Sequence, residues 1–343
     1  MTRKKNICAL STTHIRAQGK TLAVPSIDWL QLDFRGSFFR CASFDWKLLD
    51  ITTRHFSKIQ EARKKEFPIF EVVYEPKSPM LPQDLHLCKL NNRELYWLNP
   101  VKRLIQFAKD CNLFYNRVSR VDLCLDFNYF SNNYNPEQFV KDFMSGKYIS
   151  RKKRNGQTNF KHGDKLEFNY LRLQNKRSFV SVYLYNKSKE MRDVKKKNYI
   201  IKKWEVCGLN TKKDVWRLEF SIHNAKFDII DKYTKVKKPF DVNLIDDNFY
   251  LNDVIQVLID NYFTFYHSTN TRARNCKKKL HLFYFNPTKQ VIQFRDDSMS
   301  TGRGDVMFIN KLRELNDELR RAKRGEAQSC KEVLNYVKKT RGL

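Results

Sequence analysis

Three segments of the sequence alternate apolar residues with residues that can do chemistry. They span residues 120–127, 182–187 and 216–222. Successive side chains of a β-strand point to opposite faces of the sheet, so each segment is predicted to be a strand with one core face and one chemical face. The chemical faces carry Arg120, Asp122, Cys124 and Asp126 in the first segment, Tyr183, Tyr185 and Lys187 in the second, and Arg217, Glu219 and Ser221 in the third.

If these strands are neighbours, Asp122, Glu219 and Tyr185 lie on one surface. Carboxylate oxygens are the ligands that hard divalent ions such as Mg²⁺ and Mn²⁺ prefer, and such an ion polarises a phosphodiester. A phenol can attack the phosphorus, but its ordinary pKa of about 10 requires nearby positive charge, which Lys187 and Arg217 could supply. The pattern therefore predicts the parts of a metal-assisted phosphoryl transfer.

Asp126 is a third candidate metal ligand, with a geometric restriction. It lies four positions from Asp122, which is roughly 13 Å on an unbent strand, so one ion cannot contact both carboxylates. We therefore expect Asp122 and Glu219 as ligands, with Asp126 behind them or facing the substrate unless a β-bulge re-aims it. The alternative interpretation is a solvated strand face with cross-strand ion pairs, and the pattern alone leaves both open.

The charge of the chain indicates a polyanionic partner. The 343 residues contain 66 Lys and Arg against 37 Asp and Glu, a net charge of +29. The surplus is spread along the chain, so the folded body is basic, which is typical of nucleic-acid-binding proteins. A hydrophobic content of 41% excludes a disordered basic protein. We expect phosphate contacts from two basic runs, which contain Arg151, Lys152, Lys153 and Arg154, and Lys195, Lys196 and Lys197.

The order of the elements favours one fold class. Alternation also predicts strands at residues 27–34, 69–74, 166–173 and 280–285, and helical spacing predicts helices at residues 101–114, 136–144, 244–265, 306–321 and 327–339. Several strands follow one another closely, which favours an α+β fold with a mostly antiparallel central sheet and flanking helices. We expect a basic arm at 1–20, a catalytic domain at 21–238 and a mostly helical basic extension at 239–343.

Cysteine spacing and hydropathy bear on the compartment. The eight cysteines include no Cys-x-x-Cys pair, so we expect reduced thiols in a cytoplasm. No apolar run approaches the roughly 18 residues of a membrane span, and the N-terminal sequence lacks the apolar stretch of a secretory signal. We therefore expect no membrane partner.

Four segments, in their order and spacing, resemble the replication-initiator family of rolling-circle plasmids and conjugative transposons, which includes nicking relaxases. They are an opening strand, an Arg-hydrophobe-Asp strand with a trailing Asp, a Tyr-Asn-Lys-x-x-Glu segment and an Arg-hydrophobe-Glu strand, at residues 27–32, 118–126, 182–190 and 216–219. The resemblance covers residues 27–225, and the last hundred residues have no counterpart in it.

The resemblance implies a nucleophile and a product. Tyr185 would attack one DNA strand, form a 5′-phosphotyrosyl bond and release a 3′-OH for a polymerase. Tyr183 shares its face and is the second candidate, either as nucleophile or as a stacking platform for an unpaired base.

The resemblance also implies the groups around the nucleophile. Asp122 and Glu219 would hold the divalent ion, and Glu190 would assist as ligand or base. Arg120 and Arg217 would contact phosphate or orient the carboxylates.

The predicted function is therefore a rolling-circle replication initiator that binds and nicks origin DNA at a single-stranded or hairpin site. A relaxase that mobilises a conjugative element, or a non-catalytic DNA-binding protein on the same fold, is the alternative. A tyrosine recombinase is excluded, because none of the seven histidines begins a His-x-x-Arg motif. Further partners consistent with this function are a helicase or another replisome component, and a second copy of the chain.

Overall fold

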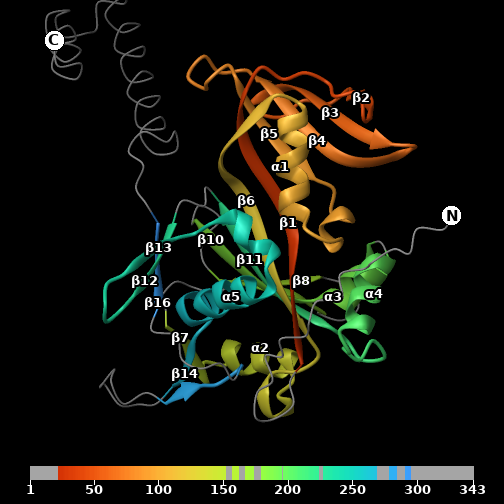
Figure 1. Ribbon diagram of the computed structural model, residues 1–343. Coiled ribbons are helices and arrows are strands. Elements are labelled where there is room, and N and C mark those ends of the chain that lie inside the picture. Colours follow the sequence, from red (N-terminus) through yellow and green to blue (C-terminus); the bar gives the residue numbers. More distant parts are fainter. Residues whose placement is uncertain are drawn as a thin grey trace, which may run out of the picture. The chain divides into compact units, whose positions relative to one another are not determined.

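Two long strands connect the two halves of the main sheet. The computed structural model describes residues 22–151, 157–161, 167–173, 179–194, 196–223, 227–268, 278–283 and 290–294. Within them, β1 (Ala23–Gly36) and β6 (Leu113–Phe127) pair antiparallel along their length. In Figure 1 they run, in red and yellow, from the orange strands into the green ones. Because β1 and β6 belong to both halves, side chains far apart in the sequence share one continuous sheet face.

The described part of the chain forms an α+β fold, as predicted. Its main sheet has ten strands and every neighbouring pair is antiparallel. In spatial order they are β2 (Asp45–Leu49), β3 (Phe56–Lys64), β4 (Phe67–Pro76), β5 (Leu85–Leu90), β1, β6, β11 (Trp216–His223), β10 (Val180–Asn186), β9 (Glu167–Leu173) and β8 (Gln157–Lys161).

Two small sheets and several helices complete the described structure. The small sheets are β13 (Lys237–Pro239), β12 (Phe227–Asp231) and β16 (Gln290–Phe294), and β15 (Lys279–Leu280), β14 (Phe265–His267) and β7 (Tyr148–Ser150). The helices are α1 (Pro100–Asp110), α2 (Pro136–Met144), α3 (Lys187–Asp193), α4 (Asn198–Val206) and α5 (Asn248–Tyr262), with 3₁₀ turns η1 (Glu94–Tyr96), η2 (Ser131–Asn133) and η3 (Val242–Asp246).

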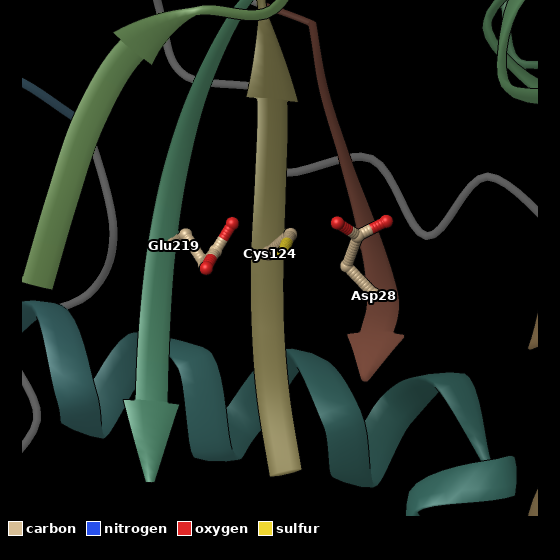
Figure 2. A group of neighbouring side chains, drawn as sticks. All are labelled: Asp28, Cys124 and Glu219. Carbon is tan, nitrogen blue, oxygen red and sulfur yellow. The ribbon is translucent and has the colours of Figure 1, made fainter. Parts of the chain in front are cut away.

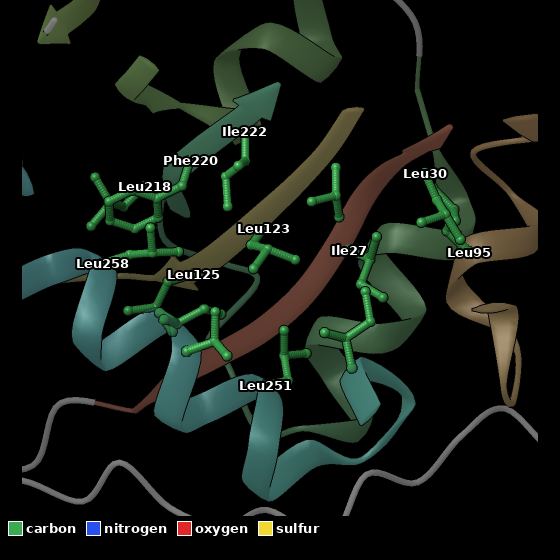
Figure 3. Packing of buried hydrophobic residues seen from close by; sticks show 14 of the residues in the cluster. Ile27, Leu30, Leu95, Leu123, Leu125, Leu218, Phe220, Ile222, Leu251 and Leu258 are labelled. Atoms are coloured by element: carbon green, nitrogen blue, oxygen red, sulfur yellow. The ribbon is translucent and has the colours of Figure 1, made fainter. Parts of the chain in front are cut away.

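Helix α5 covers the apolar face of the central strands. In Figure 3, Leu258 lies beside Leu125 and Leu218, with Leu251 further along α5, and all four are buried. Each strand sends alternate side chains to this face, so the polar residues between them are turned to the other side of the sheet. The apolar face thus sets the orientation of every candidate site residue on β6, β11 and β10.

A β-bulge in β1 breaks this alternation at one position. Ile27 pairs with Leu123 and Trp29 pairs with Asp122, which leaves Asp28 as an extra residue. Ile27 and Leu30 both lie in the core, three positions apart, whereas regular alternation would place core residues two or four positions apart. Asp28 and Trp29 are therefore both turned to the polar face.

Several predicted boundaries are wrong for local reasons. The helix expected at 101–114 ends at Asp110, because Asn112 has a φ of 60° and Leu113 already begins β6. The helix expected at 244–265 is divided between η3 and α5, since Asp247 caps α5 by accepting from the backbone N–H groups of Phe249 and Tyr250. In the strand expected at 280–285, β15 ends at Leu280.

The chain divides into two compact units, Met1–Phe294 and Arg295–Leu343. Buried residues on both sides of position 238, among them Phe220 and Leu258, belong to one hydrophobic core. The three-part division at residues 20 and 238 stays a prediction. The expected arm at 1–20 and the expected helices at 306–321 and 327–339 lie outside the described residues.

Candidate active site

The three strands that carry the candidate residues are neighbours in the order β6, β11, β10, as the prediction required. Glu219 is directly opposite Cys124 on β6 and Tyr183 on β10, and Ser221 is opposite Asp122. The polar face of these strands therefore gathers the predicted phenols and carboxylates.

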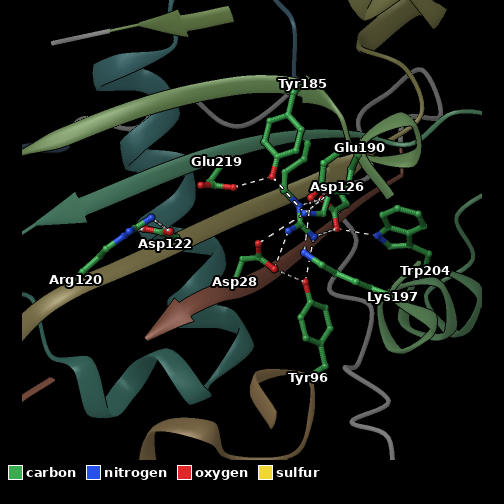
Figure 4. A network of polar contacts seen from close by, with 12 residues as sticks. Asp28, Tyr96, Arg120, Asp122, Asp126, Tyr185, Glu190, Lys197, Trp204 and Glu219 are labelled. Atoms are coloured by element: carbon green, nitrogen blue, oxygen red, sulfur yellow. Dashed lines mark hydrogen bonds and ion pairs between the residues drawn. The ribbon is translucent and has the colours of Figure 1, made fainter. Parts of the chain in front are cut away.

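Tyr185 donates a hydrogen bond from its hydroxyl to Glu219 Oε2 at 2.8 Å, as Figure 4 shows. Lys187 Nζ lies 3.5 Å from the same phenolic oxygen. Lys187 is the first residue of α3, whose N-terminus is capped by the Asn186 side chain accepting from the Lys189 N–H at 2.8 Å. The end of β10 and the start of α3 thus hold the phenol and the ammonium together.

The Glu219 carboxylate is held without a cation partner. Among the described residues, no Lys or Arg nitrogen lies within 4 Å of it, and its hydrogen bond comes from Tyr185. Burial, followed by the negative charges of Asp122 and Asp28, raises the pKa of Glu219 to about 7. Glu219 is therefore able to accept a proton near neutral pH.

The expected activation of the phenol by positive charge is wrong in its net effect. Arg217 acts in the expected direction, but burial and the Glu219 charge raise the pKa of Tyr185 well above 10. A free phenolate is therefore disfavoured in this environment. The geometry instead suits removal of the Tyr185 proton by Glu219 at the moment of reaction.

Asp28 is the acidic residue that the sequence patterns miss. The bulge in β1 turns it toward Glu219, and one ligand atom from each of Asp28, Cys124 and Glu219 lies within 4.8 Å of the others (Figure 2). The available sequence signal was the three-residue spacing of Ile27 and Leu30, which indicates a bulge between them.

A buried ion network holds Asp28 in place. Arg217 is fully buried, and its guanidinium contacts Asp28 Oδ1 at 2.8 Å and both oxygens of Asp126 at 2.7 and 2.8 Å. The Tyr96 hydroxyl donates to Asp28 Oδ1 at 2.9 Å, and Trp204 Nε1 donates to Asp126 Oδ2 at 2.7 Å. Asp126 therefore lies behind the candidate ligands. Arg217 orients carboxylates, and a phosphate would have to displace one of them to reach it.

The same network keeps Asp28 ionised. Burial raises the pKa of Asp28, but the charges of Arg217 and Lys187 and the hydrogen bonds from Arg217 and Tyr96 outweigh it. The net result is a pKa well below the ordinary value. Arg217 and Tyr96 engage Oδ1 of Asp28, and its other oxygen, Oδ2, lies 3.8 Å from Lys187 Nζ and is the less engaged of the two.

Asp122 does not join the cluster of Asp28, Cys124 and Glu219. Both of its oxygens accept from Arg120, at 3.0 and 2.6 Å. Its charge still contributes to the raised pKa of Glu219. The predicted ligand pair, Asp122 with Glu219, is thus replaced in the geometry by Asp28 with Glu219, because Arg120 lies two positions away on the same strand face.

The remaining candidates lie in different surroundings. Glu190 contacts Lys187 Nζ at 2.9 Å and Lys197 Nζ at 3.7 Å, so it lies at the edge of the network. Tyr183 is half-buried and packs edge-on against Tyr170, with 6.0 Å between ring centroids.

The two basic runs are only partly described. Arg151 is exposed and donates to the Asp260 carbonyl at 3.0 Å, and Lys196 is exposed. Lys197 is half-buried and lies 3.7 Å from Glu190 Oε1. The remaining members that we expected to contact phosphate, Lys152, Lys153, Arg154 and Lys195, lie outside the described residues.

The donor set suits a hard divalent ion. Burial raises the pKa of the Cys124 thiol well above its ordinary value, so Cys124 stays protonated and is a poor ligand. Asp28 and Glu219 remain, and Mg²⁺ is commonly bound through one or two carboxylates together with phosphates of the substrate.

The comparisons with known proteins find a distant structural similarity. No family model and no curated protein matches the chain. It is similar to a solved structure described as "Structure of Rolling Circle Replication Initiator Protein from Geobacillus stearothermophilus", with 15% sequence identity and a TM-score of 0.46. The match covers 76% of this chain and 94% of that one.

Among the described residues, no helix is both long and apolar enough to cross a membrane.

Proposed function

We propose that the chain nicks one strand of DNA through Tyr185 and thereby initiates rolling-circle replication. The observation that carries the proposal is the 2.8 Å hydrogen bond from the Tyr185 hydroxyl to Glu219, beside a second carboxylate at Asp28. The resemblance of the segments around Arg120, Tyr185 and Arg217 to replication initiators supports the choice of DNA, as does the net charge of +29.

The reaction is a transesterification. The Tyr185 oxygen forms a bond to phosphorus as its proton passes to Glu219 Oε2, and the bond from phosphorus to the 3′ oxygen breaks. The products are a 5′-phosphotyrosyl link and a strand whose 3′ oxygen takes up a proton. Lys187, 3.5 Å from the phenolic oxygen, stabilises negative charge that develops there.

Asp28 and Glu219 are the residues that would hold Mg²⁺ or Mn²⁺. When bound, the ion would polarise the scissile phosphodiester and offset its charge. Arg217, Tyr96 and Lys187 keep Asp28 oriented and ionised, and Arg120 holds Asp122 beside Glu219.

A relaxase would use the same chemistry on a conjugative element. The site does not distinguish the two, and the spread of positive charge serves either. A helicase or another replisome component, a second copy of the chain and a cytoplasmic location stay predictions.

The test is covalent attachment. Purified protein is incubated with Mn²⁺ and a supercoiled plasmid that carries the DNA surrounding its own gene, and the 5′ ends are analysed by peptide mass spectrometry. We expect the wild type to be attached through Tyr185 and Tyr185→Phe to bind DNA without attachment. Tyr183→Phe, on the same strand and face, is the matched control and should attach normally.

Attachment of the Tyr185→Phe variant would show that the nucleophile is misassigned. Salt-sensitive DNA binding without any adduct in the wild type would instead favour a non-catalytic DNA-binding protein.

A further inference from the structure

A line of contacting side chains leads from the candidate active site across the polar sheet face toward β5. Arg120 lies over the Trp29 ring, with its guanidinium carbon 4.5 Å from the ring centroid. Lys89 lies over the same ring, with Nζ at 3.8 Å. Both cations sit on strands next to Trp29, because the strand order here is β5, β1, β6. We call Arg120, Trp29 and Lys89 the cationic saddle.

The cationic saddle ends at a small cavity. Lys89 Nζ also lies 4.0 Å from Glu71 Oε2, and Glu71 is opposite both Lys89 and Glu61 in the sheet register. The cavity has a volume of about 110 Å³ and is lined by Glu61, Pro68, Phe70, Glu71, Lys89, Asn91 and Asn92. It is well below the roughly 300–1,000 Å³ of sites for drug-sized ligands.

The cavity lining suits one small group with hydrogen-bond donors. Two carboxylates accept hydrogen bonds and repel small anions, while the two asparagines can both donate and accept. Amino groups on nucleobases are donors of this kind: Glu accepts from the amino group of cytosine, and Asn pairs with adenine. Thymine carries no such amino group.

The cavity lies close enough to Tyr185 for one unpaired DNA strand to reach both. From Lys89 to Glu219 there are three strand steps and a shift of about four residues, which together amount to roughly 20 Å. Several nucleotides of an unpaired strand cover this length, and the cationic saddle lies along the way, where it can contact phosphates.

We infer that the cavity between Glu61, Glu71 and Asn91 receives a single unpaired base of the DNA strand that Tyr185 cuts, and that it selects bases carrying an amino group over thymine. The inference rests on the proposed function for its choice of nucleic acid. It adds a base-reading subsite that lies away from the chemistry.

The test measures binding and not cleavage. Fluorescence anisotropy is recorded with labelled single-stranded 18-mers of dT, dC and dA, in EDTA and at fixed salt. We expect the wild type to bind the dC or the dA strand roughly tenfold more tightly than the dT strand. Glu71→Gln should remove most of this preference, because glutamine donates as well as accepts. The affinity for dT should not fall, since the variant also removes a negative charge 4.0 Å from Lys89 Nζ.

Glu75→Gln is the matched control, because Glu75 lies on the same strand and pairs with Lys58, outside the cavity. It should keep the wild-type preference. Lys89→Gln tests the cationic saddle: it should weaken binding of all three strands and reduce the slope of log affinity against log salt by about one.

Equal affinities of the wild type for the three strands, or a preference that survives Glu71→Gln, would overturn the inference. A base preference without any covalent adduct would leave the cavity assigned and remove the proposed nicking. An adduct at Tyr185 without a base preference would do the reverse.

Discussion

Two clusters in this protein combine a tyrosine, a lysine and a carboxylate with opposite results. At the candidate active site, the Tyr185 hydroxyl donates to Glu219, with Lys187 nearby. Around α2 and β7, the Tyr134 hydroxyl donates to Asp142 at 2.6 Å, and Lys147 Nζ contacts the same carboxylate oxygen at 2.7 Å.

The difference lies in burial and in the partner of the lysine. Hydrogen bonds from Lys147 and Tyr134 lower the pKa of Asp142 to about 2, so this carboxylate stays charged. Burial and the negative charges of Asp122 and Asp28 raise the pKa of Glu219 to about 7, and Lys187 pairs with Glu190 and Asp28 instead of with Glu219. Residue types alone therefore do not identify a reactive site, because burial and the pairing of the cation decide whether the carboxylate can take a proton.

The largest expected effect comes from removing each carboxylate in turn. Glu219→Gln should lower the nicking rate at least about 100-fold, because the variant can neither accept the Tyr185 proton nor offer a charged ligand to the divalent ion. Asp142→Asn should leave the rate unchanged. The measurement is the initial rate on supercoiled plasmid at saturating DNA and Mn²⁺, and equal rates for the wild type and Glu219→Gln would remove Glu219 from the mechanism.

The cations should differ almost as strongly in their effect on stability. Arg217→Met leaves Asp28 and Asp126 buried without their partner and should lower the free energy of unfolding by about 3–5 kcal/mol. Lys147→Met removes a pair whose lysine side chain is 55% exposed and screened by solvent, so the loss should be much smaller than that of Arg217→Met. Urea unfolding of the two variants tests this ranking, which similar losses would contradict.

A divalent ion should act on only one of the two clusters. At ten times its dissociation constant, Mn²⁺ should stabilise the wild type by about 1.4 kcal/mol, seen as a rise in Tm. Asp28→Asn should abolish the rise and Asp142→Asn should keep it. An undiminished rise in Asp28→Asn would place the ion elsewhere.

The smallest effects are pH dependences of opposite sign, measured by urea unfolding in EDTA. The folded pKa of Asp142 is depressed from 3.8 to about 2, so its contribution is complete above about pH 4 and is lost as the pH falls toward 2. The folded pKa of Glu219 is raised from 4.5 to about 7, so its contribution is complete below about pH 4 and is lost as the pH rises through 7.

The stability difference between wild type and Asp142→Asn should therefore shrink on acidification. The wild type should lose stability relative to Glu219→Gln on moving from pH 5 to pH 8, because only the wild type ionises at this position. Curves that run in parallel for both variants would contradict the contrast between the clusters.

The sequence predicts the shared face of the three strands because side-chain direction in a strand has a period of two. Tyr185 and Glu219 therefore meet on adjacent strands, as expected. The same period cannot show that Arg120 takes both oxygens of Asp122, because a side chain can lean along its own strand. It also cannot place Asp28, whose position depends on the bulge.

The supporting groups from other elements leave no local pattern. Tyr96 comes from a 3₁₀ turn 121 residues before its partner Arg217, and Trp204 comes from α4, 78 residues after Asp126. Only the packing of η1 and α4 onto the polar face brings them to the network. Sequence periodicity predicts which way a residue points, and tertiary packing decides what it meets.

The extra residue in β1 contributes to both the candidate active site and the cationic saddle. It lets one strand present a carboxylate to the cluster with Glu219 and, at the very next position, an indole to the cationic saddle. Deleting either residue would restore regular alternation and leave room for just one of these two side chains on the polar side. If the chain cuts DNA as proposed, this one bulge therefore fixes both the position of the cleavage site and the position of the surface that the DNA follows beyond it.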